Sequence, residues 1–90
     1  MAKLTKQEQA VIKDLEWMVQ GVELDYGKIA VGRYTPSDRY RAEVNARAVI
    51  YQLIGAKHAM ITIAPESRQG IIANEIEQLL DRLLKAGVEI

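Results

Sequence analysis

The sequence contains no cysteine and only one histidine, His58. A chain without cysteine cannot form a disulfide scaffold, a thiolate zinc site or a cysteine nucleophile, and it suits a reducing compartment, for which we take the cytoplasm. Zinc and facial-triad sites need a second histidine or cysteine at ligand spacing, which is missing here. We therefore expect no metal and no cofactor.

Proline and glycine are also scarce, with two and six residues, and 49% of the residues are hydrophobic. This composition excludes collagen-like and low-complexity chains and predicts one folded domain over residues 1–90. A chain of 10.1 kDa is expected to expose about 5,300 Å² once folded, which leaves only a modest core. Association between copies would add stability.

Long uncharged hydrophobic runs are missing as well. The most apolar stretch, residues 48–64, contains Gln52, Lys57 and His58, which do not suit a membrane span. The N-terminus is charged from Lys3 onward and lacks the apolar stretch of a secretory signal. We expect no membrane partner.

Helical periodicity, by contrast, is clear from the first residues on. Thr5 and Glu8 have the spacing of a capping box, in which each side chain satisfies a free amide of the first turn. Apolar residues then recur at intervals of three and four, which predicts a helix over about residues 5–26. Gly27 is the expected terminator.

Two further helices follow, and local sequence signals mark the start of the first and the end of the second. Thr35 followed by Pro36 and an acidic first turn predicts a helix over about residues 36–63, apolar on more than one side. The third helix is predicted over about residues 66–86, with Gly87 as a left-handed stop.

These elements predict an all-α fold, either a three-helix bundle or a helical hairpin with the N-terminal helix packed across it, assembled as a homodimer. The alternative is an α+β fold. In that version residues 28–34, 59–63 and 88–90 form a small sheet covered by helices.

Positive charge is concentrated in the middle of a chain whose overall charge is zero. Residues 28–58 carry six basic and two acidic residues, whereas the segments on either side each carry three basic and five acidic ones. Arginine forks, tyrosine rings and the start of a helix together favour phosphate groups, in a nucleotide or a nucleic acid. The candidate residues for binding such an anion are Lys28, Arg33, Tyr34, Arg39, Tyr40, Arg41 and Arg47.

The same charges have a simpler explanation, because a basic helix between two acidic helices complements its neighbours. Gly27 and Gly32 have phosphate-loop spacing, but Arg33 and Tyr34 stand where that loop needs Lys and Ser or Thr. This segment is therefore not a Walker loop.

Catalytic groups form no convincing constellation in the sequence. As a general base, His58 would need a nucleophile and an orienting acid within reach. We expect a protein that is not an enzyme. The residues considered and set aside are Ser37, Thr62, Glu66 and Ser67 around the histidine, and Glu75, Glu77 and Asp81 on the polar side of the third helix.

Trp17 and Met18 are the candidate residues for a protein interface. Trp17 falls outside the main apolar seam of its helix, and tryptophan is a frequent energetic anchor in interfaces. Each helix of a three-helix bundle has only two contact seams, so the broad apolar surfaces of the first two helices predict self-association.

We therefore predict a small helical interaction module that binds a partner protein and also forms a homodimer. By class-level analogy, such chains are typical of accessory inhibitors or regulators of phages and other mobile elements. The alternative function is binding or sequestration of a nucleotide or nucleic acid through the basic segment.

Overall fold

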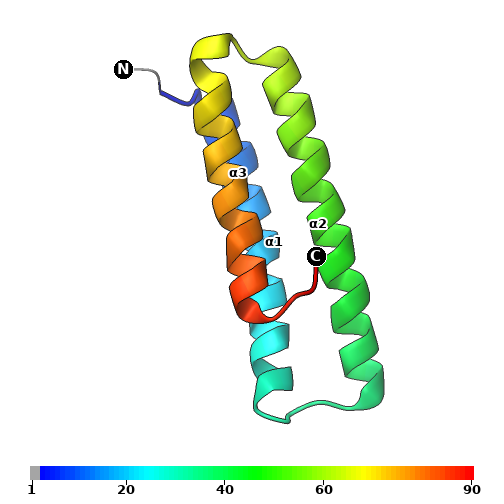
Figure 1. Cartoon of the computed structure of the whole chain (residues 1–90). Helices are drawn as coiled ribbons and strands as arrows, with labels where there is room; N and C mark the ends of the chain where they lie inside the picture. Colours follow the sequence, from blue (N-terminus) through cyan, green and yellow to red (C-terminus); the bar gives the residue numbers. More distant parts are fainter. Residues whose placement is uncertain (1–2) are drawn as a thin grey trace.

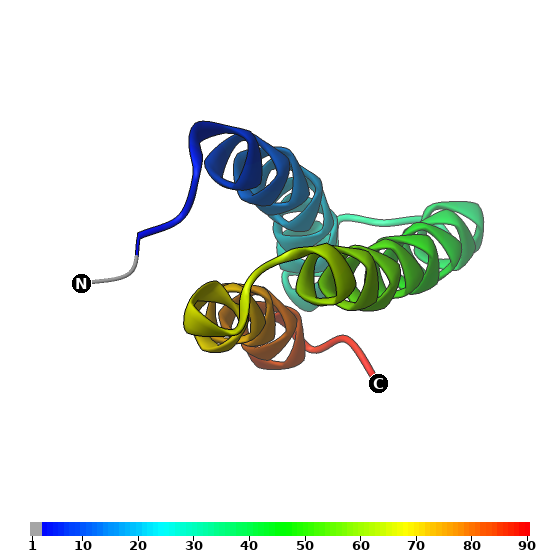
Figure 2. The same cartoon turned by 90° about the horizontal axis from the view of Figure 1, so that it is seen from above.

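The computed structural model describes residues 3–90 as three helices, α1 (Lys6–Ala30), α2 (Pro36–Ile63) and α3 (Glu66–Ala86), joined by short connections (Figure 1). Each helix contacts the other two, and from above the three rods lie at the corners of a triangle (Figure 2). The bundle measures 46 × 19 × 19 Å. The predicted all-α class is confirmed for this part of the chain; the predicted domain also includes residues 1–2, which lie outside it.

Capping boxes begin the first two helices; the sequence predicts the box at Thr5, whereas at Thr35 it predicts only a helix start. The Glu8 amide donates to Thr5 Oγ1 at 3.1 Å, and the Thr5 amide donates to the Glu8 carboxylate at 2.8 Å. Thr35 and Asp38 repeat this exchange at 3.1 and 3.0 Å. These reciprocal bonds satisfy amides that the first turn of a helix leaves free.

The predicted end of the first helix is wrong. We expected Gly27 to end it near residue 26, but α1 continues to Ala30. The left-handed residue is Gly32, with φ +76°, and the Arg33 amide closes the turn by donating to the Lys28 carbonyl at 2.8 Å. Gly27 only weakens a helix, whereas a positive φ is what stops one.

The α+β alternative is also not supported, because residues 3–90 contain no strand. Residues 28–30 complete α1, and residues 59–63 complete α2, where Met60 packs against the core. After α3, Gly87 adopts the predicted left-handed conformation, and the Val88 amide bonds to the Leu83 carbonyl at 3.0 Å. Residues 88–90 form an extended tail whose Val88 is buried.

The core runs through the centre of the triangle and is entirely apolar. It is built from side chains that repeat at three- and four-residue intervals on one face of each helix, which is why these helices bury together. Its largest fully buried side chains are Val19 and Val22 from α1, Leu53 from α2, and Ile72, Ile76 and Leu83 from α3.

Ion pairs at the rim join α3 to both neighbours. Arg82 bonds the Glu23 carboxylate at 2.6 Å and Glu16 at 3.3 Å, and both acids lie on α1. Lys57 of α2 bonds Glu77 of α3 at 2.9 Å. Complementary charge between neighbouring helices therefore accounts for part of the acidic surplus of α1 and α3.

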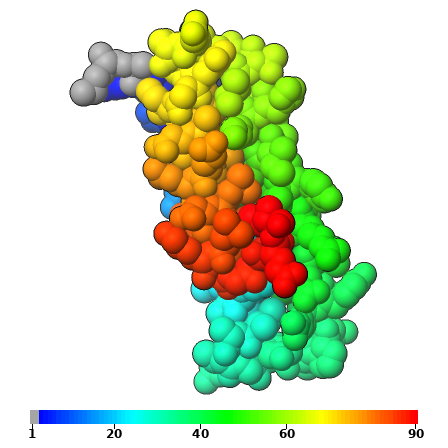
Figure 3. Space-filling model, in the orientation of Figure 1, coloured from blue at the N-terminus to red at the C-terminus, as the bar shows by residue number. Residues whose placement is uncertain are grey.

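α2 is longer than α3, with 28 residues against 21, which is a difference of about 10 Å in length. The end of the bundle at the α1–α2 connection therefore projects beyond α3 (Figure 1). In the space-filling view, the C-terminal residues lie against the surface of α2 just above this end (Figure 3). Within residues 3–90 no helix is long and apolar enough to cross a membrane.

Candidate functional site

The projecting end brings most of the predicted anion-binding residues together around two hollows. The first hollow has a volume of about 470 Å³ and lies between the end of α1 and the start of α2. Four of the predicted residues line it, namely Lys28, Arg33, Tyr34 and Arg41. Two carboxylates, Asp25 and Asp38, line the same hollow, so its charge is mixed.

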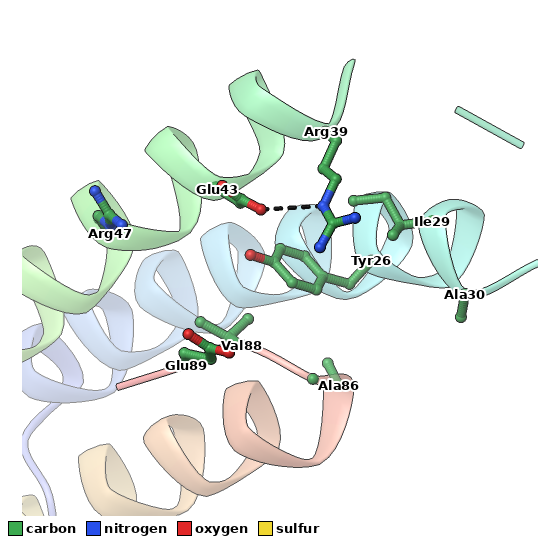
Figure 4. Close-up of a pocket in the computed structure, with 10 residues that line it drawn as sticks. Tyr26, Ile29, Ala30, Arg39, Glu43, Arg47, Ala86, Val88 and Glu89 are labelled. Atoms are coloured by element: carbon green, nitrogen blue, oxygen red, sulfur yellow. Dashed lines mark hydrogen bonds and ion pairs between the residues drawn. The ribbon is translucent and has the colours of Figure 1, made fainter. Parts of the chain in front are cut away.

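The second hollow, of about 400 Å³, lies on the other side of α2, where the C-terminal tail crosses toward it (Figure 4). Arg39 and Arg47 line it together with Glu43, Glu89 and Tyr26. Tyr40, the remaining predicted residue, lines neither hollow and is exposed on α2. The seven predicted residues thus divide between three places and do not form one site.

Acidic groups on α2 bind two of these arginines. Arg39 Nε donates to Glu43 at 3.2 Å, and this bond raises the pKa of the guanidinium. Arg41 lies 3.5 Å from Asp38. Bonds from Thr35, first its amide and then its hydroxyl, lower the pKa of Asp38, so that carboxylate stays charged.

Three basic residues of the segment, Lys28, Arg33 and Arg47, have no carboxylate within 4 Å in the described part of the chain. They lie on different sides of α2, since Lys28 and Arg33 line the first hollow and Arg47 lines the second. The segment therefore offers separate cations and not one concentrated anion site.

Tyr26 projects into the second hollow (Figure 4). Partial burial raises the pKa of its phenol, and the nearby carboxylates of Glu43 and Glu89 raise it further. The ring also packs against the core, and its edge lies 3.8 Å from the position that a Cβ on Gly87 would occupy. Tyr26 thus supports the docking of the C-terminal tail.

His58 lies exposed on α2, remote from both hollows. The hydroxyl of Thr62, one of the nucleophiles considered, donates to the backbone carbonyl of His58 at 2.7 Å and so is engaged within its own helix. Among residues 3–90, no three His, Cys, Asp or Glu side chains are grouped so that they could hold a metal ion.

The outer side of α2 carries a second row of side chains, turned away from the core. Its members repeat at alternating intervals of four and three residues, the spacing of a coiled-coil seam. We call this row the outer seam; it consists of Tyr40, Val44, Arg47, Tyr51, Ile54 and His58. Every member is exposed, and the four apolar or aromatic ones expose 69%, 47%, 74% and 50% of their surface in chain order.

The inner face of α2 has the same spacing, displaced by two residues. Ala42, Ala46, Val49 and Leu53 follow it, and all four are buried. A displacement of two residues turns a helix by about 200°, so the two rows lie on opposite sides of α2. One bundle can bury only one of them.

The two predicted interface residues of α1 separate in the structure. Met18 is half-buried and packs against the core, so it belongs to the bundle. Trp17 is 77% exposed, and Leu24, seven residues further along the same face, is exposed as well. The outer side of α1 therefore offers only these two large apolar side chains over its middle turns.

The surface of the chain is large for its mass. It measures 6398 Å², about 1,100 Å² more than a compact monomer of this mass is expected to expose. A standard interface buries about 800 Å² on each partner. The excess is comparable to that area, and the elongated shape of the bundle, 46 × 19 × 19 Å, contributes to it.

Comparisons with models of known protein families, with curated proteins and with solved structures gave no match. Fold and exposed surface therefore carry the functional argument.

Sequence reasoning predicted that the second helix is apolar on more than one side, but it did not identify the outer seam as one row. Tyr40, the first member of the row, was assigned to the anion site instead. The signal was the repeated interval of four and three residues from Tyr40 to His58.

Proposed function

We propose that the chain is a non-enzymatic helical interaction module that forms a homodimer through the outer seam of α2. The observation that carries this proposal is the second apolar row on a helix whose first row already forms the core. Complete burial of a large apolar side chain contributes about 1.5–3 kcal/mol, and the apolar and aromatic seam members, which leave 47% to 74% of their surface in water, forgo a corresponding share of it. A second copy that covers the seam recovers part of it.

The dimer leaves the outer side of α1 free, and there Trp17 serves as the anchor for a partner protein. In this role the module regulates or inhibits that protein by occupying its surface. The exposure of Trp17, with Leu24 on the same face, supports this assignment.

Tyr51 is the residue with which to test the dimer, because it lies near the middle of the seam and is the most exposed member with a large ring. The Tyr51→Glu substitution places a charge where the proposed dimer requires an apolar contact that excludes water. We expect the dissociation constant of the dimer, measured by analytical ultracentrifugation, to rise at least about 100-fold, or about 2.7 kcal/mol.

The matched control is Gln52→Glu, which adds the same charge at the next residue, also exposed but off the seam. It should leave the dissociation constant within about threefold of the wild-type value, since surface changes away from a contact have small effects. Both variants should melt at the same temperature in dilute solution. A chain that is monomeric at every concentration would refute the homodimer.

Binding of a nucleotide or nucleic acid at the projecting end is the second candidate function. Its support is the first hollow, where Lys28, Arg33, Tyr34 and Arg41 converge. We rank it below the interaction module because Asp25 and Asp38 share that hollow. Titration of a labelled oligonucleotide and of nucleotides at increasing salt tests it, since binding driven by phosphate contacts weakens as salt rises.

A further inference from the structure

We propose that the second copy docks antiparallel to the first, with the two-fold axis crossing the outer seam midway between Arg47 and Tyr51, at the level of Val49 along α2. This inference rests on the proposed homodimer and adds its geometry. In a two-fold dimer of antiparallel helices, residues equidistant from the axis on either side face each other across the interface. The axis position therefore determines every pair in the outer seam.

An axis at the level of Val49 gives each seam residue a chemically suitable partner in the other copy. Tyr40 of one copy faces His58 of the other, and Val44 faces Ile54. Arg47 faces Tyr51, where the guanidinium can stack on the ring as a cation–π pair. Since the symmetry repeats each pair, all six members of both seams are covered.

Arg47 is available for this contact. It is exposed at the border between the outer seam and the second hollow, which it also lines, and no carboxylate lies within 4 Å of it in the described part of the chain. Arginine is also well suited to this position, because its planar group is weakly hydrated and stacks on aromatic faces.

The residues that flank the seam agree with the same axis. Flanking residues lie one position to either side of the seam, so their pairs are centred one residue away from Val49. Glu43, on one flank, thus comes close to Lys57 of the other copy, and these charges are opposite. In the monomer each already has one partner, Arg39 at 3.2 Å and Glu77 at 2.9 Å, so the contact extends existing surface pairs. On the other flank, Ala48 meets its own copy at the axis, where a small side chain permits close approach.

Other axis positions that keep seam residues facing each other leave some of them without a suitable partner. If the axis moves toward the N-terminus by one seam interval, about 3.5 residues, His58 lies beyond the start of the partner's α2. Moving it one step toward the C-terminus sets Arg47 against His58, and Tyr40 then faces the end of the partner's α2. A parallel dimer places Arg47 against its own copy, and like charges at one seam position repel.

Disulfide trapping in the chain of 90 residues tests the geometry, because the sequence has no cysteine. The variants are Val44→Cys and Ile54→Cys, at half-exposed seam positions whose substitution leaves the core intact. We expect a mixture of the two, with one of them isotope-labelled, to form the mixed disulfide at least about tenfold faster than either variant forms a disulfide with itself.

Gln52→Cys is the control, because this exposed residue lies off the seam and should remain a thiol under the same conditions. Faster disulfides within each variant alone would establish a parallel dimer and overturn the antiparallel geometry, while the homodimer itself would stand. A dimer by ultracentrifugation without trapping at either site would overturn it too. A monomer by ultracentrifugation would refute both proposals.

Discussion

α2 and α3 pack into the same core, yet they divide their hydrophobic residues differently. On α3, Ile72, Ile76, Leu79 and Leu83 form one buried row, and the opposite side is polar except for Leu84, which exposes 52% of its surface. On α2, one apolar row is buried and another is exposed. α3 is thus complete within a single bundle, whereas α2 has the pattern of a helix packed on two sides.

The difference shows that the periodicity of a helix reports how many contacts it makes, and not only that it is a helix. A single stripe is enough for a helix at the edge of one bundle. The second stripe of α2 has no counterpart among residues 3–90, which is why we assign it to a second copy.

The most demanding test of this comparison concerns the buried rows of α2 and α3, which pack into the same core. Leu53 of α2 and Leu83 of α3 are both fully buried. We expect Leu53→Ala and Leu83→Ala each to lower the free energy of unfolding by about 2–5 kcal/mol, as cavities in a packed core do. Urea denaturation in dilute solution measures both.

The comparison would fail if Leu53→Ala lowered the free energy of unfolding by less than about 1 kcal/mol while Leu83→Ala lowered it by about 2–5 kcal/mol. It would mean that the inner row of α2 does not form the core, and the two rows of that helix would have to exchange roles. The slope of the denaturation curve should stay unchanged in both variants.

A smaller effect distinguishes the starts of the helices. α1 and α2 begin with capping carboxylates, Glu8 and Asp38, whereas α3 begins at Pro65 without a side-chain cap bond. The cap bonds lower the pKa of both carboxyls from their ordinary values of 4.5 and 3.8. The unfolded chain therefore takes up these protons first as the pH falls.

The stabilisation from the two caps is complete above those ordinary values and is lost as the pH falls through the lowered ones. We expect acid to lower the protection factors of the amides, that is, the intrinsic exchange rates at each pH relative to the observed rates, in the first turns of α1 and α2 before it does so at the start of α3. Asp38→Asn should make the first turn of α2 less sensitive to acid. Equal acid sensitivity at all three starts would contradict this account.

Much of the fold could be predicted from the sequence because its signals are local. The box at Thr5, the helix start at Thr35 and the stop at Gly87 involve residues close in the chain, and the structure has them as predicted. The end of α1 was missed because Gly27 and Gly32 are equally good stop signals in a sequence. Only the backbone shows that Gly32 has the positive φ.

The candidate site was less predictable, because charge in a sequence does not reveal its partners. The net charge of the basic segment suggested one anion site, but Asp38 and Glu43 bind two of its arginines. Of the remaining residues, four divide between two hollows, and Tyr40 lines neither. The outer seam could be read from spacing alone, yet assigning it to the outside required the position of the core.

The most direct test of the central claim is hydroxyl-radical footprinting as a function of protein concentration. We predict that oxidation of Tyr51 falls as the concentration rises, because a second copy covers the outer seam, while oxidation of the equally exposed Trp17 stays constant. Oxidation of Tyr51 that remains as high as that of Trp17 at every concentration would contradict the claim.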